Sequence, residues 1–308
     1  MAEPRASPVL AIALVIVVLI AGGAGAVFLY YEDHKAPAPS PLTVQVGDNV
    51  TVNYIGIFGG GPQQGRVFDT SEYSVALNNA SWPKSLQYTS RGATPSDYTP
   101  LGVYVGGNAP QSGYTIGNLT FNSVVPGFWQ GLIGLPGNRT HYVTVPPSLG
   151  YSFVNSSCFA TQPLTTTYPV LVALTPTQFT ELFANVSATA GTVFTDPVYG
   201  WQDAVLSVNA TTLIYENLPT LGMTTNPSGW PVIVSNISAT EVTLTSQLNP
   251  SQAGLIAGHS SGAGLCSSNS FIVTQVNLAA GTYVEDYNHE VDGATLVFIV
   301  NVVDIFRP

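Results

Sequence analysis

The sequence predicts an α+β fold: an antiparallel sheet around one short helix, a mostly β domain inserted into it, and an N-terminal transmembrane helix. Apolar and polar residues alternate over residues 44–57, which is typical of half-buried strands. Residues 124–135 predict the end of a strand, a turn and one short helix with an apolar face. The Val/Ile-rich segment 295–305 predicts the strand that closes the sheet.

The composition narrows the class of protein. Only 8% of the 308 residues are charged, and the formal net charge is -10. The seven Lys and Arg residues are scattered, which argues against a nucleic-acid partner. Abundant Gly, Pro, Ser and Thr favour short strands and turns over helical bundles. The acidic balance also suggests a protein that works in an acidic medium.

The N-terminus predicts a membrane anchor. Residues 9–31 carry no charge and match the ~20 residues that cross a bilayer. We expect a cytoplasmic segment 1–8, an anchor 9–31 and a Pro-rich linker 32–41, with the remainder outside a single-pass cell membrane because Arg5 precedes the anchor. The alternative is a signal peptide cleaved after Ala24-Gly25-Ala26.

Two further features agree with export. The two cysteines, Cys158 and Cys266, are expected to pair in an oxidising compartment, the alternative being two buried thiols. The number of Asn-X-Ser/Thr sequons favours a glycosylated outer surface. The sequons begin at Asn49, Asn79, Asn118, Asn138, Asn155, Asn185, Asn209 and Asn236.

A series of short motifs runs through both ends of the chain. They are Gly47-Asp48 with Val50, Val52, Tyr54 and Gly56; Phe68-Asp69-Thr70-Ser71; Val124-Val125-Pro126-Gly127-Phe128; Gly131-Leu132 with Gly134-Leu135; Val145-Pro146-Pro147; Tyr151; and Thr295-Leu296-Val297-Phe298. In order and spacing they resemble the FKBP-type peptidyl-prolyl cis-trans isomerases. The resemblance covers a discontinuous domain of residues 42–153 and 288–308.

The resemblance implies an apolar pocket that binds proline, with no cofactor and no metal. The pocket residues it implies are Tyr54, Phe68, Asp69, Val124, Val125, Phe128, Tyr151 and Phe298. Phe128 stands where the family has an indole, and Trp129 comes one position late. A second pocket Phe has no clean match because residues 72–113 form a long extra loop, so Tyr114 is a candidate. Without the resemblance, these aromatics would be read as ordinary core.

About 135 residues separate Tyr151 from the point where the pattern resumes. This resembles the SlyD-like subgroup, which carries an inserted flap domain at this site and re-enters through Asn288-His289 and Gly293. The usual Pro after His is Glu290 here. We therefore expect residues 154–287 to form an inserted, chaperone-like domain. His289 is read as a structural turn residue in preference to a metal ligand.

The inserted segment carries its own patterns. Thr175 to Gln178 predicts a capped helix start. Gly200-Trp201 and the following apolar residues recur 29 positions later from Gly229-Trp230, which predicts two similar hairpins with turns at Asn209 and Ser238. Candidates for a client-binding surface are Trp201, Trp230, Tyr199 and Tyr215, although the two Trp side chains are better explained as core.

The leading hypothesis is a membrane-anchored, extracytoplasmic prolyl isomerase and folding chaperone. Its partners would be unfolded or proline-containing exported polypeptides and, through the anchor, the membrane; a monomer is expected. The alternative is a non-catalytic, surface-layer-associated binding module on the same fold. A hydrolase is disfavoured because the four histidines fall in no catalytic motif.

Overall fold

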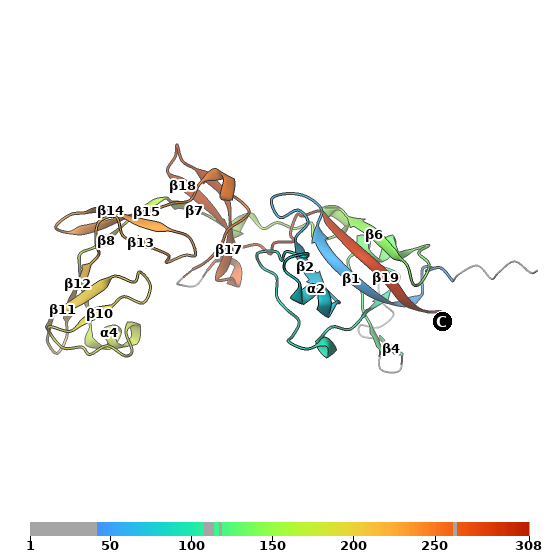
Figure 1. The fold of residues 1–308 in the computed structure, drawn as a ribbon, viewed down its shortest axis with the longest axis horizontal. Helices are drawn as coiled ribbons and strands as arrows, with labels where there is room; N and C mark the ends of the chain where they lie inside the picture. The colour runs from blue at the N-terminus through green and yellow to red at the C-terminus, as the bar shows by residue number, and fades with distance from the viewer. Residues whose placement is uncertain (1–41, 108–113, 117–118, 261–263, 308) are drawn as a thin grey trace, which may run out of the picture. The chain divides into compact units, whose positions relative to one another are not determined.

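The computed structural model describes residues 42–107, 114–116, 119–260 and 264–307 (Figure 1). Within these residues the chain forms nineteen strands and three short α-helices. The helices are α2 (Tyr73–Leu77), α3 (Pro126–Leu132) and α4 (Pro176–Leu182). Single 3₁₀ turns are η1 (Pro95–Asp97), η2 (Pro147–Leu149), η3 (Ser156–Cys158), η4 (Pro250–Gln252) and η5 (Leu265–Ser267).

The predicted α+β class is wrong, because the described chain is mostly β. The helix expected near residue 128 is present as α3, but it has only seven residues, and α2 and α4 are no longer. Gly, Pro and β-branched residues break up every longer helical stretch, so hydrogen bonds between strands satisfy most of the backbone.

The predicted single-pass membrane architecture also needs correction. Among the described residues, no helix is long and apolar enough to cross a bilayer. The segment 9–31, on which that prediction rested, lies outside the described residues. The membrane anchor and the cell-membrane location inferred from it are therefore unsupported.

The discontinuous domain of residues 42–153 and 288–308, which we call the host domain, is built on one antiparallel sheet in the order β2-β1-β19-β6, with β3 also paired to β1. Its strands are β1 (Asn49–Phe58), β2 (Val67–Thr70), β3 (Leu101–Tyr104), β6 (Thr140–Val145) and β19 (Leu296–Phe306), and β4 (Tyr114–Ile116) and β5 (Leu119–Phe121) form a separate hairpin. The strands β1 and β19 pair from Asn49–Phe306 to Phe58–Leu296, and they lie side by side in Figure 1. The first and last strands of this domain are thus its central pair.

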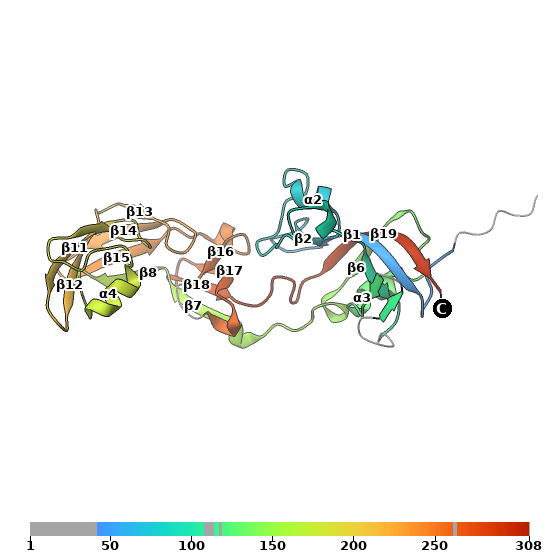
Figure 2. The same ribbon diagram turned by 90° about the horizontal axis from the view of Figure 1, so that it is seen from below.

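One face of this sheet is covered by α3, which lies close to β6 (Figure 2). Pro126 occupies the first turn of the helix, where a missing N–H costs nothing. Phe128 and Leu132, one turn apart, are 2% and 0% exposed and pack with the alternating inward residues of β19. The helix therefore fixes Phe128 against the middle of the sheet.

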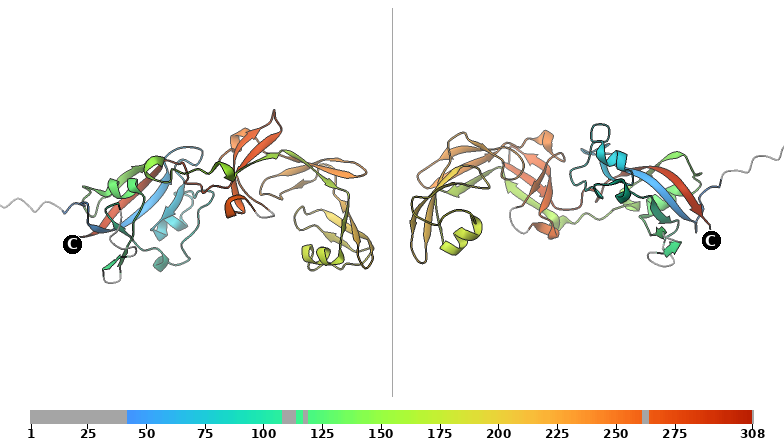
Figure 3. Two further views of the ribbon diagram at one scale, coloured as in Figure 1. Left: turned by 180° about the vertical axis from the view of Figure 1, so that it is seen from behind. Right: turned by 60° about the horizontal axis from the view of Figure 1, so that its bottom comes forward.

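The inserted domain, residues 154–287, consists of three four-stranded antiparallel sheets, which we call the repeat sheets. The first part of the insert, the outgoing chain, contributes one strand to each of the three sheets. The rest of the insert, the returning chain, then adds three more strands to each sheet, taking the sheets in the reverse order. Early and late segments of the insert therefore share a sheet (Figure 3). The first repeat sheet is β9 (Leu171–Leu174), β10 (Val193–Thr195), β11 (Gln202–Val208) and β12 (Leu213–Leu218). The second is β8 (Thr165–Pro169), β13 (Thr224–Thr225), β14 (Val232–Ile237) and β15 (Glu241–Ser246). The third is β7 (Phe159–Pro163), β16 (Ala257–His259), β17 (Ser270–Asn277) and β18 (Thr282–Asp286).

The three repeat sheets share one backbone device. In each, a glycine with positive φ donates its N–H to the carbonyl of a buried valine at the start of a β-bulge. The pairs are Gly191–Val205 at 2.8 Å, Gly222–Val234 at 2.8 Å and Gly254–Val273 at 2.6 Å. The two predicted hairpins belong to the first and second repeat sheets. The third repeat sheet was not predicted, because Asn269 stands where the other two have Trp201 and Trp230.

The repeat sheets have two cores. In the first repeat sheet, Phe179 from α4 and Phe183, which follows the helix, pack against Phe194 and Tyr215. As predicted, α4 begins at a Thr175 capping box. Trp201 and Trp230 are 2% and 3% exposed in the core shared by the second and third sheets, so they are core residues, as the sequence favoured.

The expected disulfide is present. Cys158 and Cys266 are bonded across a sequence separation of 108 residues. In the chain-entropy model, closing a loop of this size contributes about 4–5 kcal/mol. Beside it, Asn155 and Asn288 join the two chain crossings: the Asn288 Oδ1 accepts from the Asn155 N–H at 2.8 Å, and its Nδ2 donates to the Asn155 carbonyl at 3.2 Å.

The sequons differ in accessibility. Asn49 is 5% exposed inside β1, so this sequon cannot carry a glycan on the folded chain. Asn118 lies outside the described residues. Exposed side chains are found at Asn79, Asn138, Asn185, Asn209 and Asn236.

Asp203 on β11 makes the stability of the insert depend on pH. Its side chain is fully buried, and burial, with a smaller contribution from the Asp196 carboxylate, raises the pKa of Asp203 to about 7. Between pH ~4 and this value the folded chain keeps a proton that the unfolded chain has lost. Raising the pH through this window should therefore lower the free energy of unfolding, by about 2–4 kcal/mol.

Asp203→Asn tests this expectation. Denaturant unfolding of the variant, followed between pH 4 and pH 8, should lose that fall in stability, since the amide does not ionise. Glu241→Gln, which removes an exposed carboxylate of the same insert, should keep it. Parallel pH profiles for the wild type and Asp203→Asn would contradict the assignment.

Candidate active site

The eight pocket residues expected from the sequence line one cavity of about 280 Å³. They come from five places in the host domain: β1, β2, the start of α3 with the two residues before it, the segment after η2, and β19. The residues are Tyr54, Phe68, Asp69, Val124, Val125, Phe128, Tyr151 and Phe298, and Leu101 and Ser123 complete the lining. Segments almost 250 residues apart in the chain thus meet at one hollow.

The inner wall of the cavity is aromatic. Phe298 is its centre: the ring centroids of Phe128, Phe68 and Tyr54 lie 4.7, 5.6 and 6.0 Å away, in edge-on or tilted arrangements. Phe298, Phe128 and Tyr54 are at most 7% exposed. Such interlocked rings hold the wall rigid and leave apolar faces toward a ligand. Trp129 is not among the lining residues, so the aromatic floor is Phe128.

A polar edge borders this wall. The Tyr54 hydroxyl donates to Asp69 Oδ2, and Arg91 binds both partners. The Arg91 Nη2 lies 3.0 Å from Asp69 Oδ2, its Nε donates to Oδ1 at 3.2 Å, and the guanidinium lies 5.4 Å from the centre of the Tyr54 ring. The carboxylate, the phenol and the guanidinium therefore fix one another in place.

The electrostatics keep the Tyr54 hydroxyl and the Arg91 guanidinium of this edge protonated. Burial, followed by the Asp69 charge, raises the pKa of Tyr54, so its hydroxyl stays a donor. Burial acts to lower the pKa of Arg91, but the hydrogen bond to Asp69 and the electrostatic interactions with Tyr54 and Asp69 outweigh it, and the net shift is upward. Tyr54 and Arg91 thus stay hydrogen-bond donors across the physiological range.

Glu290 binds the extra loop, residues 72–113, which carries Arg91. Its carboxylate accepts from the Ser85 hydroxyl, from Gln63 Nε2 at 3.3 Å and from the Gln87 N–H at 3.0 Å. Its own N–H donates to Gln87 Oε1 at 2.9 Å. Proline, the residue expected here from the resemblance, has neither that N–H nor a carboxylate. Glu290 therefore holds the long loop in place beside the pocket.

Tyr151 stands at the mouth of the cavity. It is 42% exposed, and its carbonyl accepts from the Gly293 N–H at 2.7 Å, which links it to the point where the chain re-enters the host. Burial, then the Asp69 charge, raises the pKa of Tyr151, so its hydroxyl is a donor. A second hollow of about 250 Å³, lined by Phe68, Asp69, Tyr151 and Gln87 among others, adjoins this side.

Sequence reasoning missed Arg91 and Leu101. Arg91 lies in the 72–113 loop, where no motif marks it, although the chain offers few cations that could pair with Asp69. The substitute suggested for the second pocket Phe, Tyr114, begins β4, and its side chain lies outside the described part of the chain. His289 does not line the cavity, and no group of three metal-ligating side chains occurs among the described residues.

Compared with known proteins, the sequence matches no protein-family model and no curated protein. The resemblance drawn from the motifs therefore depends on the residues and geometry given above.

Gly56 on β1 is a position at which a small change would disturb the cavity wall. A Cβ at Gly56 would lie 2.6 Å from the Phe68 ring, too close for any side chain. Gly56→Ala should push Phe68 out of the wall and lower the free energy of unfolding by about 1–3 kcal/mol in denaturant titrations. Gly60→Ala, where nothing lies within 4 Å, is the matched control. Equal stability of the two variants would contradict this packing.

Proposed function

We propose that the host domain is a peptidyl-prolyl cis-trans isomerase. The observation that carries the proposal is the convergence of all eight expected residues on one aromatic cavity with a fixed polar edge. A cavity of about 280 Å³ is at the small end of ligand pockets, which span about 300–1,000 Å³, and suits one ring-sized side chain. The adjoining hollow leaves room for the backbone that flanks the proline.

The chemistry of X–Pro isomerisation suits an apolar cavity with a polar edge. Rotation of an X–Pro bond breaks amide resonance and has a barrier of about 18–20 kcal/mol. The twisted amide separates less charge than the planar one, so an apolar wall favours the transition state over the ground state. The rings of Phe128 and Phe298 would hold the proline, and the Tyr151 hydroxyl would donate to the substrate carbonyl. The reaction needs no nucleophile, metal or redox group.

The Asp69 edge has a positioning role in this proposal. Arg91 and Tyr54 hold the Asp69 carboxylate at the cavity rim, where it can face the twisting amide. A carboxylate there interacts differently with the planar and twisted amides, which is the condition for a contribution to rate. The non-catalytic binding module remains the alternative, since binding requires the cavity but no discrimination between planar and twisted bonds.

The inserted domain would hold unfolded clients close to the cavity. Its first repeat sheet and the helix α4 expose several large apolar side chains, and its sheets have free strand edges. Extended apolar segments bind to such surfaces by backbone pairing and apolar contact. The exposed residues are Leu171, Leu182, Val193, Leu206 and Leu218.

A protease-coupled assay on a short X–Pro peptide distinguishes isomerase from binding module. The chain should accelerate isomerisation, and Asp69→Ala should lower kcat/KM about 10–100-fold because a charged hydrogen-bonded group is lost. Asp304→Ala removes an exposed carboxylate from the same sheet, outside the cavity, and should leave the rate unchanged. No acceleration by the wild-type chain would leave only the binding-module alternative.

Removing the insert tests its role. Asn155 and Asn288 are hydrogen-bonded to one another, so a short glycine linker can replace the residues between them. The shortened chain should keep its activity on peptides but lose most of its activity on a denatured protein whose refolding awaits a proline bond. Equal losses on both substrates would show that the insert supports the host fold instead of holding clients.

A further inference from the structure

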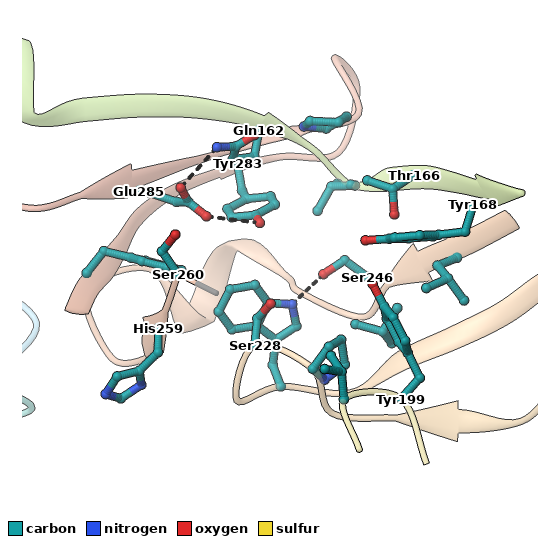
Figure 4. A pocket seen from close by; sticks show the side chains of 18 of the residues that line it. Gln162, Thr166, Tyr168, Tyr199, Ser228, Ser246, His259, Ser260, Tyr283 and Glu285 are labelled. Atoms are coloured by element: carbon teal, nitrogen blue, oxygen red, sulfur yellow. Dashed lines mark hydrogen bonds between the residues drawn. The ribbon is translucent and has the colours of Figure 1, made fainter. Parts of the chain in front are cut away.

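The inserted domain contains a cavity of its own, of about 320 Å³, between the second and third repeat sheets. Its walls come from β7, β8, β14, β15, β17 and β18, so residues from the outgoing and returning chain face each other across it (Figure 4). None of its lining residues belongs to the aromatic cavity of the host domain. It is a separate site.

Aromatic side chains form most of this cavity. Trp230 and Tyr283 meet edge to face with centroids 5.5 Å apart, and Tyr168 and Tyr199 form a second pair at 5.1 Å. The Tyr168 and Tyr283 hydroxyls point into the space between the sheets (Figure 4). The Trp230 Nε1 donates to the Ser246 hydroxyl at 2.6 Å, which fixes the indole plane. The cavity therefore presents several aromatic rings held in position.

One carboxylate faces these rings. Glu285 on β18 is 6% exposed, and its oxygens accept from neutral donors: Gln162 Nε2 at 3.1 Å, the Tyr287 hydroxyl at 3.0 Å and the Tyr283 hydroxyl at 3.3 Å. A buried carboxylate normally has a cationic partner, because desolvation of the charge is costly. The lining residues include no Lys or Arg; His259, which lines the rim, is exposed.

The sequence of the insert contains no Lys or Arg. All seven Lys and Arg residues lie outside residues 154–287, at Arg5, Lys35, Arg66, Lys84, Arg91, Arg139 and Arg307. The same segment carries the acidic residues Glu181, Asp196, Asp203, Glu216, Glu241, Glu285 and Asp286. The insert therefore attracts cations and repels anions, and it contains no Lys or Arg that could neutralise Glu285.

We propose that this cavity binds an organic cation: an ammonium or guanidinium group on an apolar stem, such as a lysine or arginine side chain. The positive group would pair with Glu285, and its stem and charge would lie against the faces of Trp230 and the tyrosines, an arrangement that favours cations. An anionic ligand would be repelled by Glu285 and by the negative charge of the insert. The proposal does not depend on isomerase activity in the host domain.

Binding to the full chain can be followed through the indole N–H resonance of Trp230 in NMR spectra, assigned with Trp230→Phe. Nα-acetyl-lysinamide and Nα-acetyl-argininamide should shift this resonance saturably, whereas Nα-acetyl-norleucinamide, the neutral counterpart of lysine, should not. Glu285→Gln should weaken binding by about tenfold or more, since a charged pair is lost. Glu241→Gln, an exposed carboxylate on β15, should leave affinity unchanged.

Several outcomes would overturn the proposal. They are equal binding of norleucinamide, an unchanged affinity in folded Glu285→Gln, saturable binding of a neutral sugar that survives Glu285→Gln, or no shift with lysinamide up to about 100 mM. The lysine–norleucine comparison uses the wild-type chain, so it decides the question even if Glu285→Gln does not fold. Butylammonium binding as tightly as lysinamide would support the site and assign it to free amines; tighter lysinamide binding would assign it to polypeptides.

Discussion

The pairing of β1 with β19 is the constraint on which the host domain depends. These strands stand at its two ends in the sequence, yet they form its central pair over the whole of β1. The remaining strands of the sheet attach to them: β2 and β3 to β1, and β6 to β19. The sheet therefore cannot close until the chain has returned from the insert, and loop closure of this length is slow relative to local pairing.

The same pairing creates the aromatic cavity. Tyr54 and Phe298 lie on the two paired strands, and only their register brings the rings within 6.0 Å. Phe68 is then seated over Gly56, which has no side chain to obstruct it. Both ends of the chain thus contribute to one wall.

The sequence was most informative where spacing follows from backbone geometry. The alternation along residues 44–57 and 295–305 located the central strands, and the ordered motifs identified the eight residues that meet at the cavity. It was least informative where partners meet across irregular segments. Arg91 is brought to Asp69 by a loop whose path is set by Glu290, Ser85 and Gln87, and no periodicity records such contacts. The predicted α+β class was wrong because the one short helix that the sequence predicted is outweighed by the nineteen strands of the described residues.

The third repeat sheet shows another limit of prediction from the sequence. Its backbone repeats the glycine and bulge of the other two, but its side chains differ, because φ and hydrogen bonding constrain Gly254 more than packing constrains Asn269. Similar backbone units with different side chains also allow a cavity between two neighbouring sheets, since the faces that meet need not be alike. The aromatic and acidic residues around Glu285 occupy one such junction.

The disulfide has a mechanical consequence. Cys158 and Cys266 close a covalent ring that contains the whole first and second repeat sheets, because β8 to β15 lie between them. If the two ends of the host domain were pulled apart, β1 and β19 would separate first under load, and the tension would then pass from Cys158 directly to Cys266. The residues between them would carry no force. The extension available to the oxidised chain is therefore shorter by the length of that ring, and the two sheets inside it would stay folded while the host is stretched.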